Sequence, residues 1–568
     1  MFKRIKLHLF LLFFIFTSHF TYAQYLDSKG TEFWLAFPES STNLASPELS
    51  FFISSSEDAE IIVEIPGLAF TDSVMIAANI ATKYTLPSGL ETLEFDTAQQ
   101  TGIKLSSVVE FSAYGLSRYP ESTDAYLGLP TDVIGTDYAV LAWDTGVVGA
   151  SEYLIVATED NTTIDITASH LDTTSADTQI TLNAGETYQH SSQENDDVTG
   201  TVISADYPIA VFAGHQCANI PDLSTLACDH ILEQLPPTNS WGSQFFTVPL
   251  AERLSGDTFR FFANLDNTEI TINDELVATI DSGEYFETIL LDATYITSSN
   301  PILVSQYSNG STFDDVTSDP FMMLIPPFEQ FLDEYTFSTP TEGFRANYLN
   351  IVVRTDSISA LSLDLTMLDP SYFTQIFSSE YSYVQIDVEL GSHTLTGAVA
   401  GVYAYGYDSY DSYGYSGGLS LSSVASVASI ELFEDYEIVD DLACFSVLVS
   451  DVDELPLEDI RVDFLIDLLN GSDRTDTQGV AEYCIEAGTN PGEYVVTATV
   501  GNETVSDTIE QTIVEEVIEE EVVEEVIDLT GDTVTSKGGG GAFGIIGILG
   551  VFSLFCRVRR KKLHFHYS

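Results

Sequence analysis

The segment Tyr207-Pro-Ile-Ala-Val-Phe-Ala-Gly-His-Gln-Cys217 contains a short apolar motif that recurs along the chain. A Thr-Gly pair precedes it at Thr199-Gly200. The same pair occurs at Thr101-Gly102 and Thr396-Gly397, and the second interval is about twice the first, with Ile296-Thr297 fitting between them. The four motifs are Val108–Phe111, Ile209–Phe212, Ile302–Val304 and Ala400–Tyr403. This spacing predicts four repeats of about 98 residues each.

Other segments repeat at the same interval. Asp160–Asp165 parallels Asp266–Thr271, and Gly185-Glu-Thr-Tyr188 parallels Gly283-Glu-Tyr-Phe286. These segments alternate apolar and polar residues and are rich in Val, Ile, Thr and Tyr, which predicts strands joined by Asp-Asn and Gly-Glu turns. We therefore predict an all-β fold. A propeller-like ring is favoured because radial closure removes exposed sheet edges, and tandem β-sandwiches are the alternative.

The motif at 207–217 is followed by Cys228-Asp-His230-Ile-Leu-Glu-Gln-Leu-Pro-Pro237 and Trp241-Gly242. Together with Gly30–Pro38 and the Tyr-rich run Tyr405–Tyr415, this order resembles the IgGFc-binding protein N-terminal domain family over about residues 28–425. The resemblance implies an extracellular all-β binding module. It supplies no catalytic residues, so we expect no enzymatic activity.

Charge limits the classes of partner. Between the two ends of the chain lie ten Lys and Arg residues against 87 Asp and Glu, a formal charge of about −77. Such acidity repels phosphate groups and excludes nucleic acid or anionic lipid as a partner. We expect it to keep an exported protein soluble in a saline habitat. No cofactor is expected, with specific calcium sites as the alternative.

Residues 1–23 have a basic start, an apolar run and a polar close, as in a secretory signal peptide. We expect signal peptidase to cleave between Ala23 and Gln24. The alternative is an N-terminal membrane anchor, although the run is short for about 30 Å of hydrocarbon.

The C-terminal segment 538–562 contains a glycine run, an apolar stretch and a basic cluster. It is similar to the GlyGly-CTERM sorting signal of Gram-negative bacteria. That resemblance implies cleavage near the glycines by a rhombosortase-like protease. A permanent single-pass anchor is the alternative. Both interpretations place the body outside the cytoplasm, at the cell surface or outer membrane or in the medium. The glycines concerned are Gly538, Gly539, Gly540 and Gly541.

Two further segments precede this tail. Residues 427–510 resemble a bacterial immunoglobulin-like domain of the invasin or intimin type, which implies a spacer. Cys444 and Cys484 are predicted to form an inter-sheet disulfide there, with two buried free thiols as the alternative. Residues 511–537 include Ile513–Ile527, which holds seven glutamates and no basic residue. We interpret 511–537 as an extended acidic stalk.

His215, Cys217, Cys228 and His230 match the ligand types of a tetrahedral zinc site. In an oxidising compartment the two cysteines are more often disulfide partners, so we expect a Cys217–Cys228 bond and no metal. Gly414-Tyr-Ser416-Gly-Gly418 matches the serine-hydrolase elbow only formally. The histidines that follow it lie behind the apolar tail segment.

The leading functional hypothesis is a non-enzymatic, surface-displayed adhesion or recognition protein that binds an extracellular glycan or protein. The alternative is a secreted hydrolase of polysaccharide or glycoprotein on a propeller scaffold. Exposed aromatics of the Tyr-rich run are the expected ligand contacts, because rigid rings give a large contact area at low entropic cost. The tyrosines concerned are Tyr407, Tyr410 and Tyr413.

Overall fold

The computed structural model describes residues 26–40, 47–193, 196–314, 316–433, 436–439, 442–452, 454–486, 493–501 and 503–510. The expected cleavage point at Ala23 and Gln24, the acidic segment 511–537 and the tail glycines Gly538, Gly539, Gly540 and Gly541 lie outside these ranges. No helix within the described ranges is long and apolar enough to cross a membrane.

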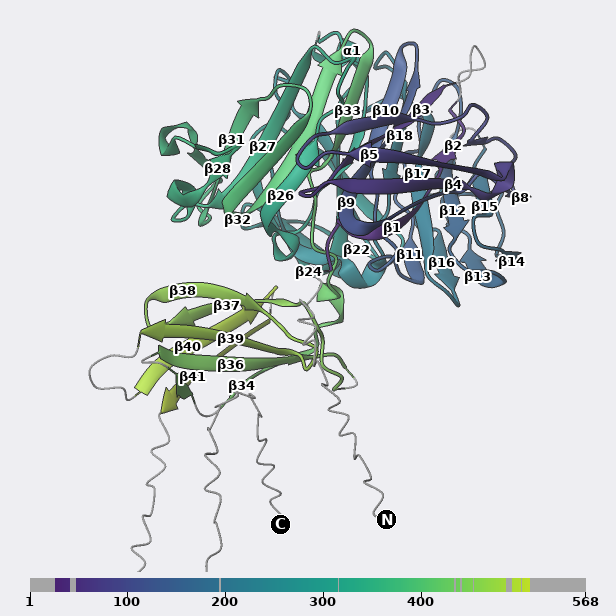
Figure 1. Cartoon of the computed structure of the whole chain (residues 1–568). Helices are drawn as coiled ribbons and strands as arrows, with labels where there is room; N and C mark the ends of the chain where they lie inside the picture. Colours follow the sequence, from purple (N-terminus) through teal and green to yellow (C-terminus); the bar gives the residue numbers. More distant parts are fainter. Residues whose placement is uncertain are drawn as a thin grey trace, which may run out of the picture. The chain divides into compact units, whose positions relative to one another are not determined.

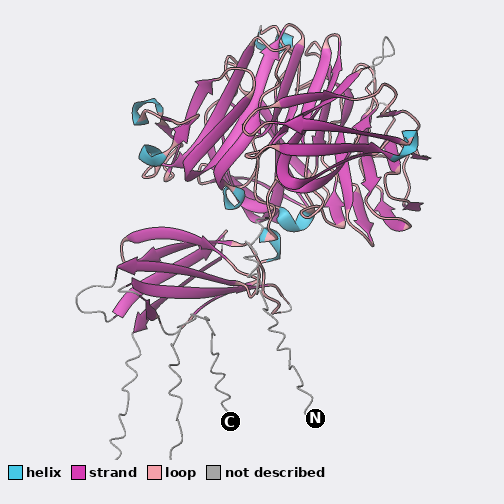
Figure 2. Cartoon of the chain, viewed as in Figure 1, coloured by secondary structure: helices cyan, strands magenta, loops and turns pink. Residues whose placement is uncertain are grey.

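The described residues form an all-β protein (Figure 2). The α-helix α1 (Ser311–Asp314) is a single turn. Short 3-10 turns lie between strands: η1 (Pro66–Leu68), η2 (Thr238–Ser240), η3 (Phe328–Gln330), η4 (Ile358–Ala360), η5 (Pro370–Tyr372) and η6 (Val424–Ser426). Residues 26–422, here called the head, contain four repeats, and a smaller sandwich follows (Figure 1).

Repeats 1 and 2 occupy residues 30–127 and 137–234. Repeat 1 has the strands β1 (Gly30–Leu35), β3 (Glu48–Ser54), β4 (Ala59–Ile65), β5 (Phe70–Ile76), β6 (Thr82–Thr85), β9 (Ile103–Tyr119) and β10 (Ser122–Leu127), with the short β2 (Phe37–Pro38), β7 (Glu91–Thr92) and β8 (Ala98–Gln99) between them. Repeat 2 has β11 (Asp137–Ala139), β12 (Ser151–Ala157), β13 (Thr162–Thr167), β14 (Thr178–Leu182), β15 (Thr187–Ser191), β16 (Val202–Ala205), β17 (Ile209–Ala218) and β18 (Asp229–Gln234).

Repeats 3 and 4 occupy residues 242–324 and 332–416. Repeat 3 has β19 (Gly242–Thr247), β20 (Asp257–Ala263), β21 (Thr268–Ile272), β22 (Glu275–Ile280), β23 (Tyr285–Leu290), β24 (Thr294–Tyr307) and β25 (Met322–Leu324). Repeat 4 has β26 (Leu332–Ser338), β27 (Ala346–Arg354), β28 (Ser362–Leu363), β29 (Thr366–Met367), β30 (Thr374–Gln375), β31 (Tyr381–Asp387), β32 (Ser392–Asp408) and β33 (Asp411–Ser416).

One pairing scheme recurs in all four repeats. A long late strand carries the recurrent apolar motif: β9, the β16–β17 pair, β24 and β32. Its first half pairs with the first strand of the repeat and with an outer hairpin, such as β21–β22. Its second half pairs with the second strand and the last strand, such as β20 and β25. The first strand has a register shift at the same place in three repeats, between Gly30 and Glu32, Gly242 and Gln244, and Leu332 and Glu334.

Each repeat is therefore two small antiparallel sheets that share one long strand. In repeat 2 they are separate, with orders β11-β16-β13-β14 and β18-β17-β12-β15-β8. Propeller blades are meanders in which neighbouring strands follow one another along the chain. Here the long strand lies between strands that are distant in sequence. The four-repeat prediction agrees with the structure, the propeller-like ring is not confirmed, and the sandwich alternative describes the sheets better.

Buried side chains fill the boundaries between repeats. One apolar core is built mainly from repeats 1 and 4, a second from repeats 2 and 3, and a third from repeats 3 and 4. Between repeats 2 and 3, the buried Arg260 forms ion pairs with Asp144 (2.7 Å), Asp197 (3.1 Å) and Glu287 (2.8 Å). Its guanidinium lies 4.0 Å from the Trp143 ring centre. A single cation thus links the two repeats.

The two ends of the head lie side by side. The N–H of Ser28 donates to the carbonyl of Leu419 (2.9 Å), and the N–H of Leu421 donates to the carbonyl of Leu26 (2.7 Å). Asp27 and Ser420 form an antiparallel bridge between them. The first described residues of the head therefore pair with its last.

The C-terminal sandwich has a core of its own. One sheet contains β34 (Ser429–Leu432), β35 (Glu437–Val439), β36 (Leu442–Ser450) and β39 (Val480–Glu486). The other contains β37 (Arg461–Ile466), β38 (Leu469–Arg474), β40 (Glu493–Val500) and β41 (Glu503–Glu510). Cys444 and Cys484 are disulfide-bonded, as expected. The expected inter-sheet position is wrong, because the two residues are direct partners on β36 and β39 of one sheet.

Candidate functional site

The last two strands of every repeat form a hairpin, and the four hairpins meet at the centre of the head. β10 lies against β18 and β33, and β25 also lies against β18 and β33. The four hairpin connections therefore converge at one end of the head, where α1 lies (Figure 1). We call them the turn face: residues 120–121, 219–228, 308–321 and 409–410. Two connections are tight turns and two are long loops.

Polar bonds hold the turn face together across every boundary between repeats. The N–H of Thr123 donates to the Asp229 carboxylate (3.1 Å), and Ser412 Oγ donates to the Asp319 carbonyl (2.5 Å). Two further links are Leu226 N to Thr312 Oγ1 (2.7 Å) and Arg118 Nη2 to Asp411 Oδ2 (3.0 Å). The loops are thus fixed to a rigid base, which lowers the entropic cost of presenting them to a partner.

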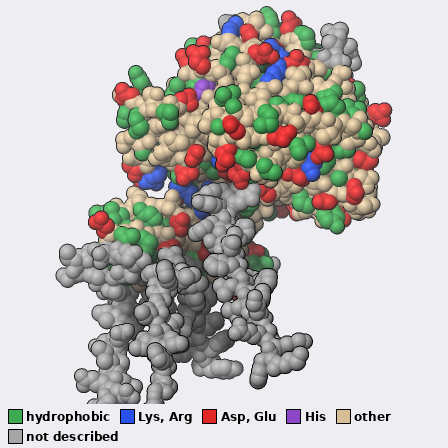
Figure 3. Space-filling view, in the orientation of Figure 1, with side chains coloured by type: hydrophobic (Ala, Val, Ile, Leu, Met, Phe, Trp, Pro, Cys, Tyr) green, Lys and Arg blue, Asp and Glu red, His purple; other side chains and the backbone are tan. Residues whose placement is uncertain are grey.

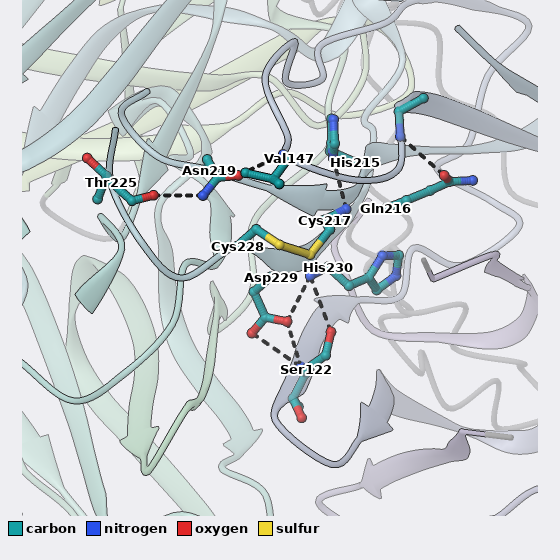
Figure 4. The surroundings of a disulfide bond; sticks show 12 residues. Ser122, Val147, His215, Gln216, Cys217, Asn219, Thr225, Cys228, Asp229 and His230 are labelled. Atoms are coloured by element: carbon teal, nitrogen blue, oxygen red, sulfur yellow. Dashed lines mark hydrogen bonds between the residues drawn. A yellow bond between two sulfur atoms is a disulfide. The ribbon is translucent and has the colours of Figure 1, made fainter. Parts of the chain in front are cut away.

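A disulfide closes the loop of repeat 2 (Figure 4). Cys217 and Cys228 are bonded, as the spacing predicted. Inside the loop the Asn219 amide donates to the Thr225 carbonyl (2.7 Å), and its oxygen accepts the N–H of Val147 (2.9 Å). One asparagine therefore orders this loop from within and fixes it to the neighbouring 144–149 connection.

The base of the turn face is rich in buried carboxyl groups. Asp124 accepts the N–H groups of Leu232 (2.9 Å) and Met322 (3.3 Å), so one side chain joins three repeats. Burial raises the pKa of Asp229, and the nearby Asp319 carboxylate raises it further. Burial also raises the pKa of Asp319, to about 7. These acids are buried at the hairpin junction.

Exposed apolar side chains lie on these loops and on connections beside them. Leu223 and Leu226 of the disulfide-closed loop are 46% and 55% exposed. Val147 and Val148 are exposed on the adjacent connection. Leu254 is 90% exposed beside Arg253, which is ion-paired to Asp314 of α1 (2.9 Å). The visible face of the head elsewhere carries scattered acidic side chains (Figure 3). Exposed apolar residues on rigid neighbouring loops are typical of protein contact sites.

Comparison with known protein families gives a match within the head. The family model described as IgGFc binding protein matches residues 124–406. This segment is similar to the IgGFc-binding protein family. It runs from within β10 of repeat 1 to within β32 of repeat 4, so it includes two of the four hairpins that form the turn face, β17–β18 and β24–β25. The wider boundaries expected from the sequence, 28–425, stay a prediction.

Among curated proteins, the IgGFc-binding protein of Homo sapiens is 25% identical over 307 residues, which is 52% of this chain. The chain spans only 6% of that protein. Among solved structures, the central fibronectin-III array of RIM-binding protein is 11% identical, with 49% of this chain and 100% of that chain covered and a TM-score of 0.11. A tetra-tandem repeat of a large adhesion protein is 12% identical, with 71% and 96% covered and a TM-score of 0.11. TM-scores this low do not indicate a shared fold.

Two of the three expected ligand tyrosines are buried. Tyr407 is 1% exposed and Tyr413 is 0% exposed, so neither can contact a ligand. The Tyr-Gly alternation is a packing pattern in which glycine makes room for a ring from a neighbouring strand. A Cβ at Gly406 would lie 2.5 Å from the Tyr413 ring, and one at Gly414 would lie 2.2 Å from the Phe321 ring. The third, Tyr410, is 44% exposed on the tight turn of repeat 4.

The histidines beside the disulfide are also buried. His215 Nδ1 accepts the N–H of Cys217 (2.9 Å). Burial lowers the pKa of His215 to about 3 and that of His230 to about 4, so both rings are neutral. Because both cysteine sulfurs are in the disulfide, the tetrahedral zinc alternative lacks its thiolate ligands.

A small cavity lies at the opposite end of the central hairpins. It holds about 40 Å³, enough for a few water molecules but not for a sugar ring. The segments that follow the four repeats contribute to its mainly apolar wall, through residues such as Leu129, Trp241, Ile325 and Leu419. A ligand of glycan or protein size fits the turn face better than this cavity.

Proposed function

We propose that this protein is an exported, surface-displayed adhesion or recognition protein of a Gram-negative bacterium, and that it binds an extracellular glycan or protein without turning it over. The turn face is the proposed contact surface. The C-terminal sandwich serves as an immunoglobulin-like spacer of the invasin or intimin type. The acidic segment 511–537 and the tail 538–562 display the head, with signal peptidase and a rhombosortase-like protease as processing partners.

The observation that carries this proposal is the pair of exposed leucines in the disulfide-closed loop. Leu223 and Leu226 lie in a segment similar to a family that is named for binding, and the loop is held by a covalent bond and by Asn219. A loop with this support presents apolar side chains at low entropic cost. Two disulfides also fit an oxidising, extracellular compartment.

Immunoglobulin Fc is one ligand to test and not the proposed ligand. The human protein carries that activity in its name, but this chain spans 6% of its length at 25% identity. The screen therefore covers glycans and extracellular proteins, with Fc among them.

The test is a binding screen with the exported protein, followed by loop variants against the strongest ligand. We expect the double substitution Leu223→Ser and Leu226→Ser to weaken binding by about 10- to 100-fold, because truncating one central apolar contact typically costs 1–2 kcal/mol. The matched control is Leu468→Ser with Leu469→Ser. Those leucines are 91% and 53% exposed, and they belong to the C-terminal sandwich and not to the turn face.

Circular dichroism and thermal unfolding must show that both double variants stay folded. Equal binding by the loop variant and the wild type would remove this loop from the site. Conversion of a glycan or glycoprotein by the wild type would overturn the non-enzymatic assignment in favour of the hydrolase.

A further inference from the structure

Three glutamates meet at the boundary between repeats 1 and 2, away from the turn face. Glu39 follows β2, Glu91 begins β7 and Glu152 lies on β12. β2 pairs with β7 in parallel, which places Phe37 opposite Glu91, and β2 also lies against β12. Strand pairing therefore brings together three acids that are far apart in sequence.

A continuous hydrogen-bond network joins their backbones and side chains. Tyr119 Oη donates to Glu91 Oε1 (2.5 Å), and the same oxygen accepts the N–H of Ser40 (3.4 Å). The N–H of Glu39 donates to Gln189 Oε1 (3.3 Å), and Gln189 Nε2 donates to Glu152 Oε2 (2.8 Å). The network orients oxygen atoms and brings no positive charge to them.

Two buried oxygens of this cluster have no hydrogen-bond partner. They are Oε1 of Glu152, which is 0% exposed, and Oγ of Ser40, which is 4% exposed. Gln216 lies near Glu152 and lowers its pKa, but it meets no hydrogen-bond geometry to that carboxylate among the described residues. A buried polar atom without a partner carries a free-energy cost, so a ligand that reached either atom would lower that cost.

The carboxyl groups of this cluster act on one another. Burial is the largest cause that raises the pKa of Glu152, followed by the carboxylate of Glu39, with a smaller contribution from Glu91. Burial likewise raises the pKa of Glu91, against the Tyr119 hydrogen bond, and Glu39 adds to it. The largest causes acting on these two pKa values are burial, other carboxylates, a hydroxyl, amides and a backbone N–H, and no Lys, Arg or His is among them.

We propose that Glu39, Glu91 and Glu152, with the hydroxyl of Ser40, form a calcium site that joins repeat 1 to repeat 2. Carboxylate and hydroxyl oxygens are the hard ligands that Ca²⁺ prefers, and its flexible coordination tolerates an irregular set. Glu152 is the fixed ligand at the base. Glu39 and Glu91 are only half-buried, which leaves a path for the ion from solvent.

Binding of one ion by all three carboxylates requires side-chain rotation. The three carboxylates do not form a group with donor oxygens all within 4.8 Å of one another, a distance that Cys444, Glu482 and Cys484 do meet elsewhere. Glu39 or Glu91 must therefore turn toward Glu152 when the ion binds. Mg²⁺ demands a near-ideal octahedral shell and dehydrates reluctantly, so this open set should favour Ca²⁺ over Mg²⁺.

The test is calorimetric titration of the whole exported protein with CaCl₂, after removal of divalent ions, in parallel with thermal unfolding. We expect one site that is tighter than the weak background from surface acids, and a thermal midpoint that rises with Ca²⁺ more than with equal Mg²⁺. Glu152→Gln and Glu39→Gln should each weaken this site at least tenfold and abolish the extra rise. Glu60→Gln is the matched control, because Glu60 is an exposed acid on β4 of the same repeat.

Glu39 is half-buried, so Glu39→Gln decides the test if Glu152→Gln does not fold. Identical titrations of Glu39→Gln, Glu60→Gln and the wild type would overturn the proposal. Equal stabilisation by Ca²⁺ and Mg²⁺ would also overturn it, because simple screening of acidic repulsion acts alike for both ions.

Discussion

Replacing Arg260 should destabilise the head strongly. The side chain is 1% exposed and forms three ion pairs, of which those with Asp144 and Asp197 cross the boundary of repeats 2 and 3. Its guanidinium carbon lies between the rings of Trp143 (4.0 Å) and Tyr285 (4.1 Å). We take Arg260→Met as the perturbation, because methionine keeps much of the volume while it removes the charge and the stacked guanidinium.

The exposure of the three acidic partners determines how much stability the Arg260→Met substitution removes. The side chains of Asp144 and Glu287 are 33% and 32% exposed, so water can solvate them once the arginine is lost. Asp197 is 5% exposed and would keep a buried charge, which accepts hydrogen bonds from Ser151 Oγ (3.2 Å) and from the N–H of Thr199 (2.8 Å). Removing one partner of a buried pair costs about 3–5 kcal/mol, which is a large share of the net stability of a domain.

Tryptophan fluorescence during urea unfolding measures this effect in the head alone. The three tryptophans, Trp34, Trp143 and Trp241, all lie in the head. We expect Arg260→Met to lower the unfolding free energy by about 4 kcal/mol, and added Asp197→Asn to restore about half of that by removing the unpaired charge. The control is Arg354→Met. Its side chain is 28% exposed and pairs with Glu380 (2.9 Å), so it should cost less than about 1 kcal/mol.

A loss below about 1 kcal/mol for Arg260→Met would refute the assignment of Arg260 as the main link between the two repeats. Equal losses for Arg260→Met and Arg354→Met would refute it too, since burial would then make no difference.

Two further predictions concern pH and export. Burial raises the pKa of Asp257 to about 7, against hydrogen bonds from Leu250 and Gln306 and the charge of Arg253. The protonated form is favoured in the folded state, so its contribution is fully present below the unfolded pKa of about 4 and is lost as pH rises through about 7. Wild-type unfolding free energy in urea should fall by a few kcal/mol from pH 5 to pH 8, and Asp257→Asn should fall less; an equal fall in both would exclude Asp257 as the cause. For export, intact-mass analysis of surface or secreted protein should show a chain that begins at Gln24 and lacks residues 542–568. Retention of 542–568 would favour the permanent anchor.

Local pattern was enough to predict the strands and the repeat. Ile209–Phe212 and its three counterparts all lie on the long late strands, because β-branched and aromatic residues at a fixed period favour one recurring strand. The Cys217–Cys228 pairing also followed from spacing and compartment. Ring closure did not, since sheet order depends on which distant strands pair, and the order of apolar motifs does not encode this.

The prediction that Tyr407 and Tyr413 contact a ligand was wrong for a related reason. Alternation in a strand normally separates a buried face from an exposed face. β33 is buried on both faces, because repeats on either side cover it, so Tyr413 cannot reach solvent. The exposed Leu223 and Leu226 lie in a segment without strand periodicity, and only the Asn219 and disulfide contacts show that it is ordered. The Glu39, Glu91 and Glu152 cluster could not be found in a chain with 87 acidic residues, because its members meet only after β2 pairs with β7.

The pairing of residues 26–28 with 419–421 makes the head an insertable unit. A module whose entry and exit points coincide can interrupt a longer polypeptide without changing the path of its host. It can also be cut at an exposed loop and rejoined at its natural ends to give a circularly permuted protein. The human protein that resembles this chain matches it over 307 residues, which are 6% of its own length.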